Sequence, residues 1–160
     1  EVVKMVFAGN KASGGEDIPF TWYDGKVTPS PSQLGLPADY VLPQNVVVIV
    51  GDKASLLVPQ GGDGYKYFRK GMERNMEMPQ ARGGNHWHLW IDEARGGDPS
   101  LTPLSYAGKV SETLAIGAVA SHAPNEMLEW DAKGMKFTNK PELNQYVTRK
   151  YRDGWAVAGL

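Results

Sequence analysis

Two histidines one residue apart, His86 and His88, are the residues of this sequence whose types could most readily do chemistry. They flank Trp87, and histidine is both a common metal ligand and a frequent general base in proteins. Residues i and i+2 project about 200° apart on a helix, so this pair could share one metal ion only on a strand. Because the spacing of the nearby tryptophans favours a helix, we predict no metal site here.

Other arrangements that carry chemistry are missing from the sequence. It contains no GxGxxG after a strand, no P-loop, no GxSxG and no HExxH. The aspartates Asp24, Asp92 and Asp131 are spread along the chain, and Asp24 before Gly25 is typical of a tight turn. The absence of cysteine excludes disulfides, thiol catalysis and thiolate metal sites. We therefore predict no catalytic, metal-binding or cofactor-binding residue.

Aromatic residues are the better candidates for binding a small molecule. Trp22 and Tyr23 precede the Asp24-Gly25 turn, where an exposed ring could stack on a sugar, and His86 at a helix start could line a cleft. These three residues are our substrate-binding candidates. One apolar stripe at helical spacing predicts core positions instead, and it consists of Trp87, Trp90, Ile91 and Ala94.

The elements that must position these residues fall into two groups. Apolar, β-prone stretches predict strands at 2–9, 18–23, 45–50 and 54–59, the last two as a hairpin. The segments 28–43 and 60–85 are rich in Pro, Ser, Gly or charge, and they predict a surface loop and a long loop that is functional or mobile. The Val46–Val50 run lacks alternation, which favours a strand covered on both faces.

Helical patterns dominate the second half. They predict helices from Asn85 to Ala94, over 103–124 and over 138–155, with a short extended piece at 127–131. The expected buried stripes are Val110, Leu114, Gly117 and Ala118 in the second helix, and Leu143, Tyr146, Val147 and Tyr151 in the third. Strands first and helices later predict an α+β fold, a mostly antiparallel open sheet with helices packed on one face.

Length and composition limit the class of protein. The 160 residues suit one domain over 1–160, with 41% apolar and 22% charged residues and a net charge of −1. Such a balance gives no electrostatic reason to expect nucleic acid as a partner. The longest apolar run, Val46–Val50, is far too short to span a membrane. Because the chain starts at Glu1 inside a strand-like stretch, we expect it to be part of a longer protein.

Six stretches taken together resemble the C-terminal domain of bacterial Gfo/Idh/MocA-type oxidoreductases, from about Phe20 to Trp155. The six stretches are FTWYDGKVTPSP, VIVGDKASLL, HWHLWIDEARGGDPS, LSYAGKVSETLAIGAVA, LEWDAKGMKFTN and PELNQYVTRKYRDGW. Within the third, His86, Trp90, Ile91 and Asp92 match the family pattern, whereas His88 stands where the pattern has no fixed residue.

This resemblance implies a substrate-side and oligomerisation domain of an NAD(P)-dependent dehydrogenase acting on a sugar or polyol-like substrate. It also implies that NAD(P) is bound by a preceding Rossmann domain, so we expect this chain to bind no cofactor itself. The face of the sheet without helices should then meet a second copy, most simply as a homodimer. A monomer whose 60–85 segment covers the sheet is the competing expectation. An NAD-dependent glycoside hydrolase of the same superfamily and a non-catalytic carbohydrate- or protein-interaction domain remain alternatives.

Overall fold

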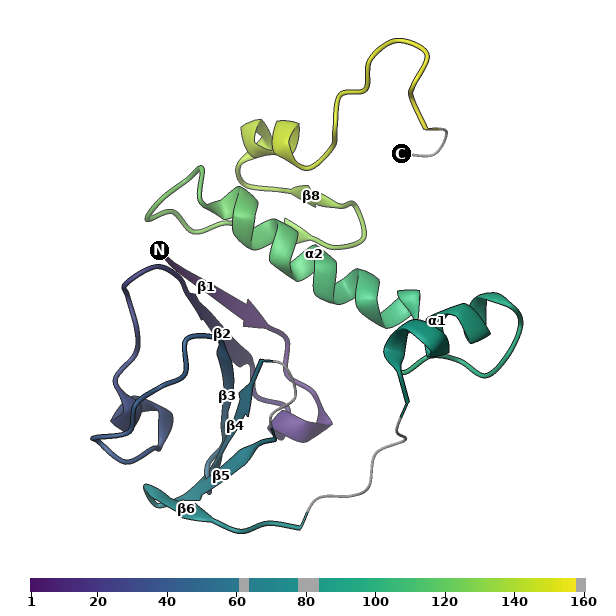
Figure 1. The fold of residues 1–160 in the computed structure, drawn as a ribbon. Coiled ribbons are helices and arrows are strands. Elements are labelled where there is room, and N and C mark those ends of the chain that lie inside the picture. The colour runs from purple at the N-terminus through teal and green to yellow at the C-terminus, as the bar shows by residue number, and fades with distance from the viewer. Residues whose placement is uncertain (61–63, 78–83, 158–160) are drawn as a thin grey trace. The chain divides into compact units, whose positions relative to one another are not determined.

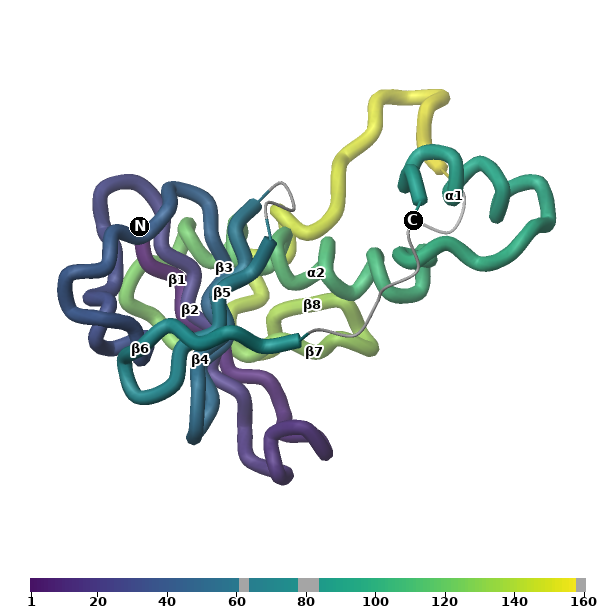
Figure 2. Tube along the Cα trace, turned by 60° about the horizontal axis from the view of Figure 1, so that its bottom comes forward, coloured from purple at the N-terminus to yellow at the C-terminus, as the bar shows by residue number. Residues whose placement is uncertain are grey.

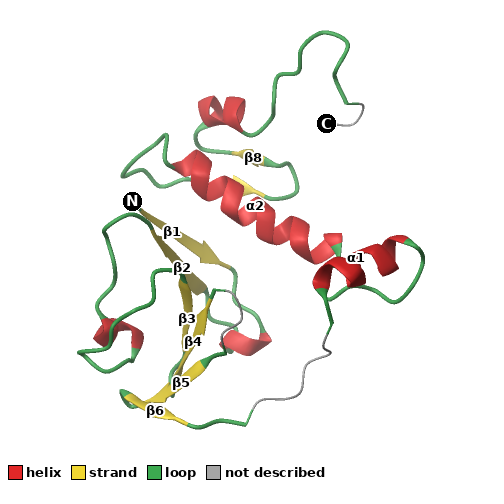
Figure 3. Ribbon diagram, in the orientation of Figure 1, coloured by secondary structure: helices red, strands yellow, loops and turns green. Residues whose placement is uncertain are grey.

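The computed structural model describes residues 1–60, 64–77 and 84–157, and the chain forms two compact units, Glu1–Arg82 and Gly83–Leu160. The sheets of the first unit and the long helices of the second are distinguished by colour in Figure 3. Strands of the described residues pair antiparallel in open sheets, which confirms the predicted α+β class. Where the sequence suggested one domain over 1–160, the chain contacts divide it into these two units.

A two-stranded ribbon opens the first unit. It consists of β1 (Val2–Phe7) and β2 (Ile18–Tyr23), paired antiparallel from Val2 opposite Tyr23 to Phe7 opposite Ile18 (Figure 1). Both strands are confirmed. Because side chains alternate along a strand, one face of the ribbon is entirely apolar. Its six residues are Val3, Met5, Phe7, Ile18, Phe20 and Trp22.

A four-stranded antiparallel sheet follows, in the order β3-β4-β5-β6. The predicted hairpin is confirmed as β3 (Val46–Val50) and β4 (Ser55–Pro59). The prediction of a loop over 60–85 is wrong at β5 (Lys66–Arg69) and β6 (Met72–Arg74), while its positions 61–63 and 78–83 lie outside the described residues. Lys70 and Gly71 join these strands with φ of +52° and +67°. A two-residue turn needs such values, but Lys-Gly is a weak sequence signal for it.

The core of the first unit lies on one face of this sheet. Leu57 and Phe68 are 0% and 1% exposed, and Leu36 from the preceding loop packs against them. That loop contains the 3₁₀ helix η2 (Pro31–Leu34). The prediction of a surface loop over 28–43 is therefore wrong, because four of its residues cover the sheet. Those residues are Leu34, Leu36, Tyr40 and Leu42.

The opposite face of the four-stranded sheet is open. Val47 and Ile49 are 58% and 60% exposed, whereas Val46 and Val48 pack against the core. The prediction that β3 is covered on both faces is thus wrong for this chain. Five consecutive β-branched residues give no alternation from which a sequence could reveal an open face. Residues 66–74 extend the sheet by two strands rather than folding over this face.

Two helices begin the second unit, as predicted: α1 (His86–Ala94) and α2 (Leu104–Ala120). Asn85 caps α1, because its Oδ1 accepts hydrogen bonds from the backbone nitrogens of Trp87 and His88 at 3.0 and 3.3 Å. Gly96, with φ +85°, follows Arg95, the C-cap residue of the helix. Within residues 1–60, 64–77 and 84–157, every helix is too short or too polar to span a membrane.

The predicted buried stripes of both helices are wrong. In α1, Trp87, Trp90 and Ile91 are 65%, 60% and 45% exposed, and Leu89 and Glu93 are the half-buried residues. In α2 the residues packed against the core are Ile116 and Val119. The predicted Val110 and Leu114 lie on a different face of the helix and are exposed. Helical spacing identifies an apolar face but does not say what covers it.

The second core joins α2 to a short hairpin, β7 (Trp130–Asp131) with β8 (Lys136–Phe137). Figure 2 shows β8 running beside α2. Phe137 is 1% exposed and contacts the Trp130 ring edge-on at a centroid distance of 5.0 Å. The buried residues of this core are Ala123, Phe137 and Leu143.

The predicted helix over 138–155 is wrong in type and length. The segment forms only the 3₁₀ helix η3 (Pro141–Tyr146), in which Leu143 is buried as expected but Tyr146 is 48% exposed. Side chains compete with helix formation here. Asn139 accepts a hydrogen bond from the Glu129 backbone nitrogen at 2.9 Å and donates one to the Met127 carbonyl at 2.8 Å.

Candidate functional site

Trp22 and Tyr23 lie next to each other on β2 and therefore point to opposite faces of the ribbon. They are 47% and 40% exposed. Trp22 belongs to the apolar face, opposite Val3. The Asp24-Gly25 turn has the predicted geometry, since Gly25 has φ +74° and its nitrogen donates to the Asp24 carboxylate at 2.6 Å. Both rings are therefore accessible to ligands. Because they lie on opposite faces of the ribbon, they cannot stack together on one side of a single ligand.

His86 is the first residue of α1 and is exposed. Its ring contacts that of Trp87 at a centroid distance of 4.6 Å. Trp22 and Tyr23 belong to the first unit and His86 to the second, so neither unit by itself brings all three candidates together. No group of three or more His, Cys, Asp or Glu side chains suited to a metal ion occurs in the described parts of the chain.

The apolar face of α1 exposes two tryptophan rings. Trp87 and Trp90 lie one turn apart, as residues three apart on a helix do, and Ile91 continues the same face. This face is made by the third of the six family-like stretches. The sequence analysis singled out these residues but predicted them to be core positions.

We expect Trp90→Ala to lower the free energy of unfolding of the isolated chain by less than about 1.5 kcal/mol, because a largely exposed side chain loses little burial. A buried tryptophan would cost about 3–5 kcal/mol. Urea denaturation of the wild type and the variant measures the difference. A loss in the larger range would show that this face is covered within the chain in solution.

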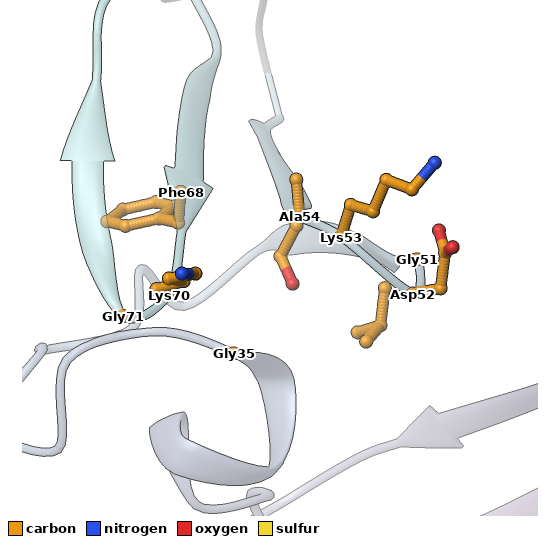
Figure 4. Close-up of a pocket in the computed structure, with 10 residues that line it drawn as sticks. Gly35, Gly51, Asp52, Lys53, Ala54, Phe68, Lys70 and Gly71 are labelled. Carbon is orange, nitrogen blue, oxygen red and sulfur yellow. The ribbon is translucent and has the colours of Figure 1, made fainter.

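A hollow in the first unit was not foreseen from the sequence. Three turns surround it: the turn at Gly35 after η2, the β3–β4 turn at 51–54 and the β5–β6 turn at 70–71 (Figure 4). Its volume is about 200 Å³, and Ser55 and Phe68 are its buried residues. Turn residues from three separate stretches line it, so no local motif could have predicted it. We call it the three-turn hollow.

Charge pairs near the sheet are exposed. Lys66 donates to Glu73 at 3.3 Å across the β5–β6 hairpin, and its Nζ lies 5.6 Å from the centre of the Tyr40 ring. The hydrogen bond to Glu73 raises the pKa of Lys66 above its ordinary value. In the second unit a hydrogen bond to Glu126 raises the pKa of Lys140 in the same way. Neither pair lies at a candidate binding residue.

Comparison with known proteins yields no relative. No family model matches the chain, and no curated protein or solved structure matches it either. The likeness to Gfo/Idh/MocA-type proteins therefore rests on the six sequence stretches, and what it implies is a proposal.

Proposed function

We propose that this chain is the substrate-side and oligomerisation domain of an NAD(P)-dependent oxidoreductase of the Gfo/Idh/MocA type that acts on a sugar or polyol-like substrate. The order of the six family-like stretches supports the type of protein. The observation that carries the proposal is the open apolar face of the four-stranded sheet, because a domain that associates needs such a surface.

The open face is apolar across three neighbouring strands. Val47 of β3 lies opposite Val58 of β4, which is 36% exposed, and Ile49 lies opposite Leu56, whose neighbour on β5 is Tyr67. Contiguous apolar surface of this kind marks interaction sites on soluble proteins. A second copy can cover it through a two-fold axis, in which the same patch faces itself.

The cofactor of the proposed enzyme does not fit the residues described. A dinucleotide fold binds the pyrophosphate at a helix that follows a strand of a parallel sheet. Every strand pair of the described residues is antiparallel. We therefore assign NAD(P) to another domain of the parent protein and derive no chemical step from this chain.

The substrate candidates contribute stacking and hydrogen bonding in this proposal. Trp22 and Tyr23 offer rings to the apolar side of a sugar, and His86 can donate or accept a hydrogen bond to a hydroxyl. A non-catalytic interaction domain is the second candidate function, and the exposed α1 face of Trp87, Trp90 and Ile91 favours it.

We expect the isolated chain to form dimers, and Ile49→Lys to convert them to monomers, because a charge on the open face would be buried without a partner. Size-exclusion chromatography with light scattering at several concentrations measures the mass. Val41→Lys is the matched control, since Val41 is 87% exposed in the loop that covers the opposite face of the sheet.

The control variant should keep the dimer mass, and circular dichroism should show that both variants are folded. A wild-type chain that stays monomeric at high concentration would contradict the oligomerisation part of the proposal. Dimers that survive Ile49→Lys would place the interface elsewhere.

A further inference from the structure

The three-turn hollow contains a buried hydroxyl with unused hydrogen-bonding capacity. Ser55 is 3% exposed and lines the hollow. The described residues give its Oγ no hydrogen-bond partner, and the hydroxyl lies in the wall of a hollow that opens to solvent. A ligand that enters the hollow can therefore accept or donate a hydrogen bond at this hydroxyl.

Glycine keeps this hydroxyl close to the wall of the hollow. A Cβ atom at Gly35 would lie 2.7 Å from the Ser55 Oγ, and Gly35 has φ +70°, which favours glycine. Opposite it, the Lys70-Gly71 turn places a lysine at the rim despite the positive φ of Lys70. Two independent turns therefore hold a glycine and a lysine beside one buried serine.

The charge of the rim favours an anion. Of the three charged residues that line the hollow, two are lysines, Lys53 and Lys70, and one is Asp52. Figure 4 shows Lys70 on the side of Phe68 and Gly71, with Asp52 and Lys53 on the far rim. Neither lysine forms an ion pair among the residues the structure describes. One carboxylate is too little for a metal ion, whereas an ammonium group with a flexible stem is a common phosphate ligand.

The size of the hollow limits the ligand. Sites for drug-sized molecules measure about 300–1,000 Å³, so about 200 Å³ accommodates a group of a few heavy atoms rather than a nucleotide. We propose that the three-turn hollow binds a small oxyanion, a phosphate group, between the Lys70 ammonium and the Ser55 hydroxyl. This site is independent of the proposed oxidoreductase function.

Titration of the isotope-labelled chain with sodium phosphate, followed by amide NMR shifts at constant ionic strength, tests the proposal. We expect saturable shifts at 51–55 and 70–71 with a dissociation constant on the order of 1 mM. Sodium chloride should give no saturable shift. A phosphate monoester, glycerol phosphate, titrated in parallel distinguishes free phosphate from an esterified group by which of the two binds more tightly.

Two variants and a control locate the binding. Lys70→Gln should weaken phosphate binding about tenfold and Ser55→Ala about threefold, because a charged hydrogen bond is lost in the first and a neutral one in the second. Lys4→Gln removes the same charge from β1, outside the hollow, and should leave the affinity unchanged. Absence of saturable shifts at 51–55 and 70–71 up to about 50 mM phosphate would overturn the proposal. Equal weakening by Lys4→Gln and Lys70→Gln would also overturn it, since binding would then follow net charge alone.

Discussion

Phe68→Ala should lower the free energy of unfolding of the first unit by about 3–5 kcal/mol. The ring is 1% exposed, and it packs against Leu36, Leu57 and, edge-on at 5.2 Å, the Tyr40 ring. Truncation removes a contact shared by the sheet and the loop that covers it. Among the residues that the structure describes, the core has only two other buried members, Leu36 and Leu57, so few side chains can move into the cavity that the substitution leaves. A loss of this size is a large fraction of the stability of an ordinary domain.

Phe7→Ala provides a matched control with the same change of side chain. Phe7 lies on the ribbon, is 39% exposed and contacts Phe20 at a centroid distance of 6.4 Å. An aromatic pair of this kind contributes about 0.5–1.5 kcal/mol beyond burial, so we expect a loss of no more than about 2 kcal/mol. Urea denaturation followed by fluorescence measures both variants. Equal losses would show that the ribbon is as well packed in solution as the core of the four-stranded sheet.

Strand positions could be predicted where residues were apolar and the turn was explicit. Val2–Phe7, Ile18–Tyr23 and the Val46–Pro59 hairpin follow this rule, with Asp24-Gly25 and Gly51 marking the turns. β5 and β6 escaped prediction because their residues are mostly charged or aromatic and their turn is Lys-Gly. Local sequence thus specifies an element when propensity and turn chemistry agree.

The identity of the buried face could not be predicted from periodicity. Trp87 and Trp90 have the spacing of a core stripe, yet both are more than half exposed, while the Pro-rich loop supplies buried Leu36. Spacing shows that residues share a face, and only the neighbouring elements decide whether that face is covered. The candidate residues Trp22, Tyr23 and His86 could be chosen as exposed aromatic or imidazole groups, and the structure places all three at the surface. The three-turn hollow depends on contacts between turns distant in sequence, to which no periodic signal applies.

Asparagine side chains illustrate the same limit in the second unit. Asn144 lies within a segment with helical spacing, but its amide pairs with the backbone of Phe137 instead. The Phe137 nitrogen donates to the Asn144 Oδ1 at 2.7 Å, and the Asn144 Nδ2 donates to the Phe137 carbonyl at 3.1 Å. A side-chain amide thereby takes the place of a neighbouring strand at the outer edge of β8. Such a pairing stabilises the hairpin and ends any helical continuation of the segment.

Asn144→Ala should therefore lower the free energy of unfolding of the second unit by about 2–4 kcal/mol, because it leaves two backbone groups of a buried residue unpaired at about 1–3 kcal/mol each. Gln145→Ala is the control. Gln145 is an exposed neighbour whose Nε2 donates to the Glu142 carbonyl at 2.9 Å, and its loss should cost less than about 1 kcal/mol. Asn144→Asp keeps the acceptor for the Phe137 nitrogen but not the donor, so an intermediate loss is expected. Hydrogen exchange of the Phe137 amide gives a local measurement, and it should accelerate strongly in Asn144→Ala but not in Gln145→Ala. If the Phe137 amide exchanged equally slowly in all variants, the Asn144 side chain would not be what closes the edge of β8.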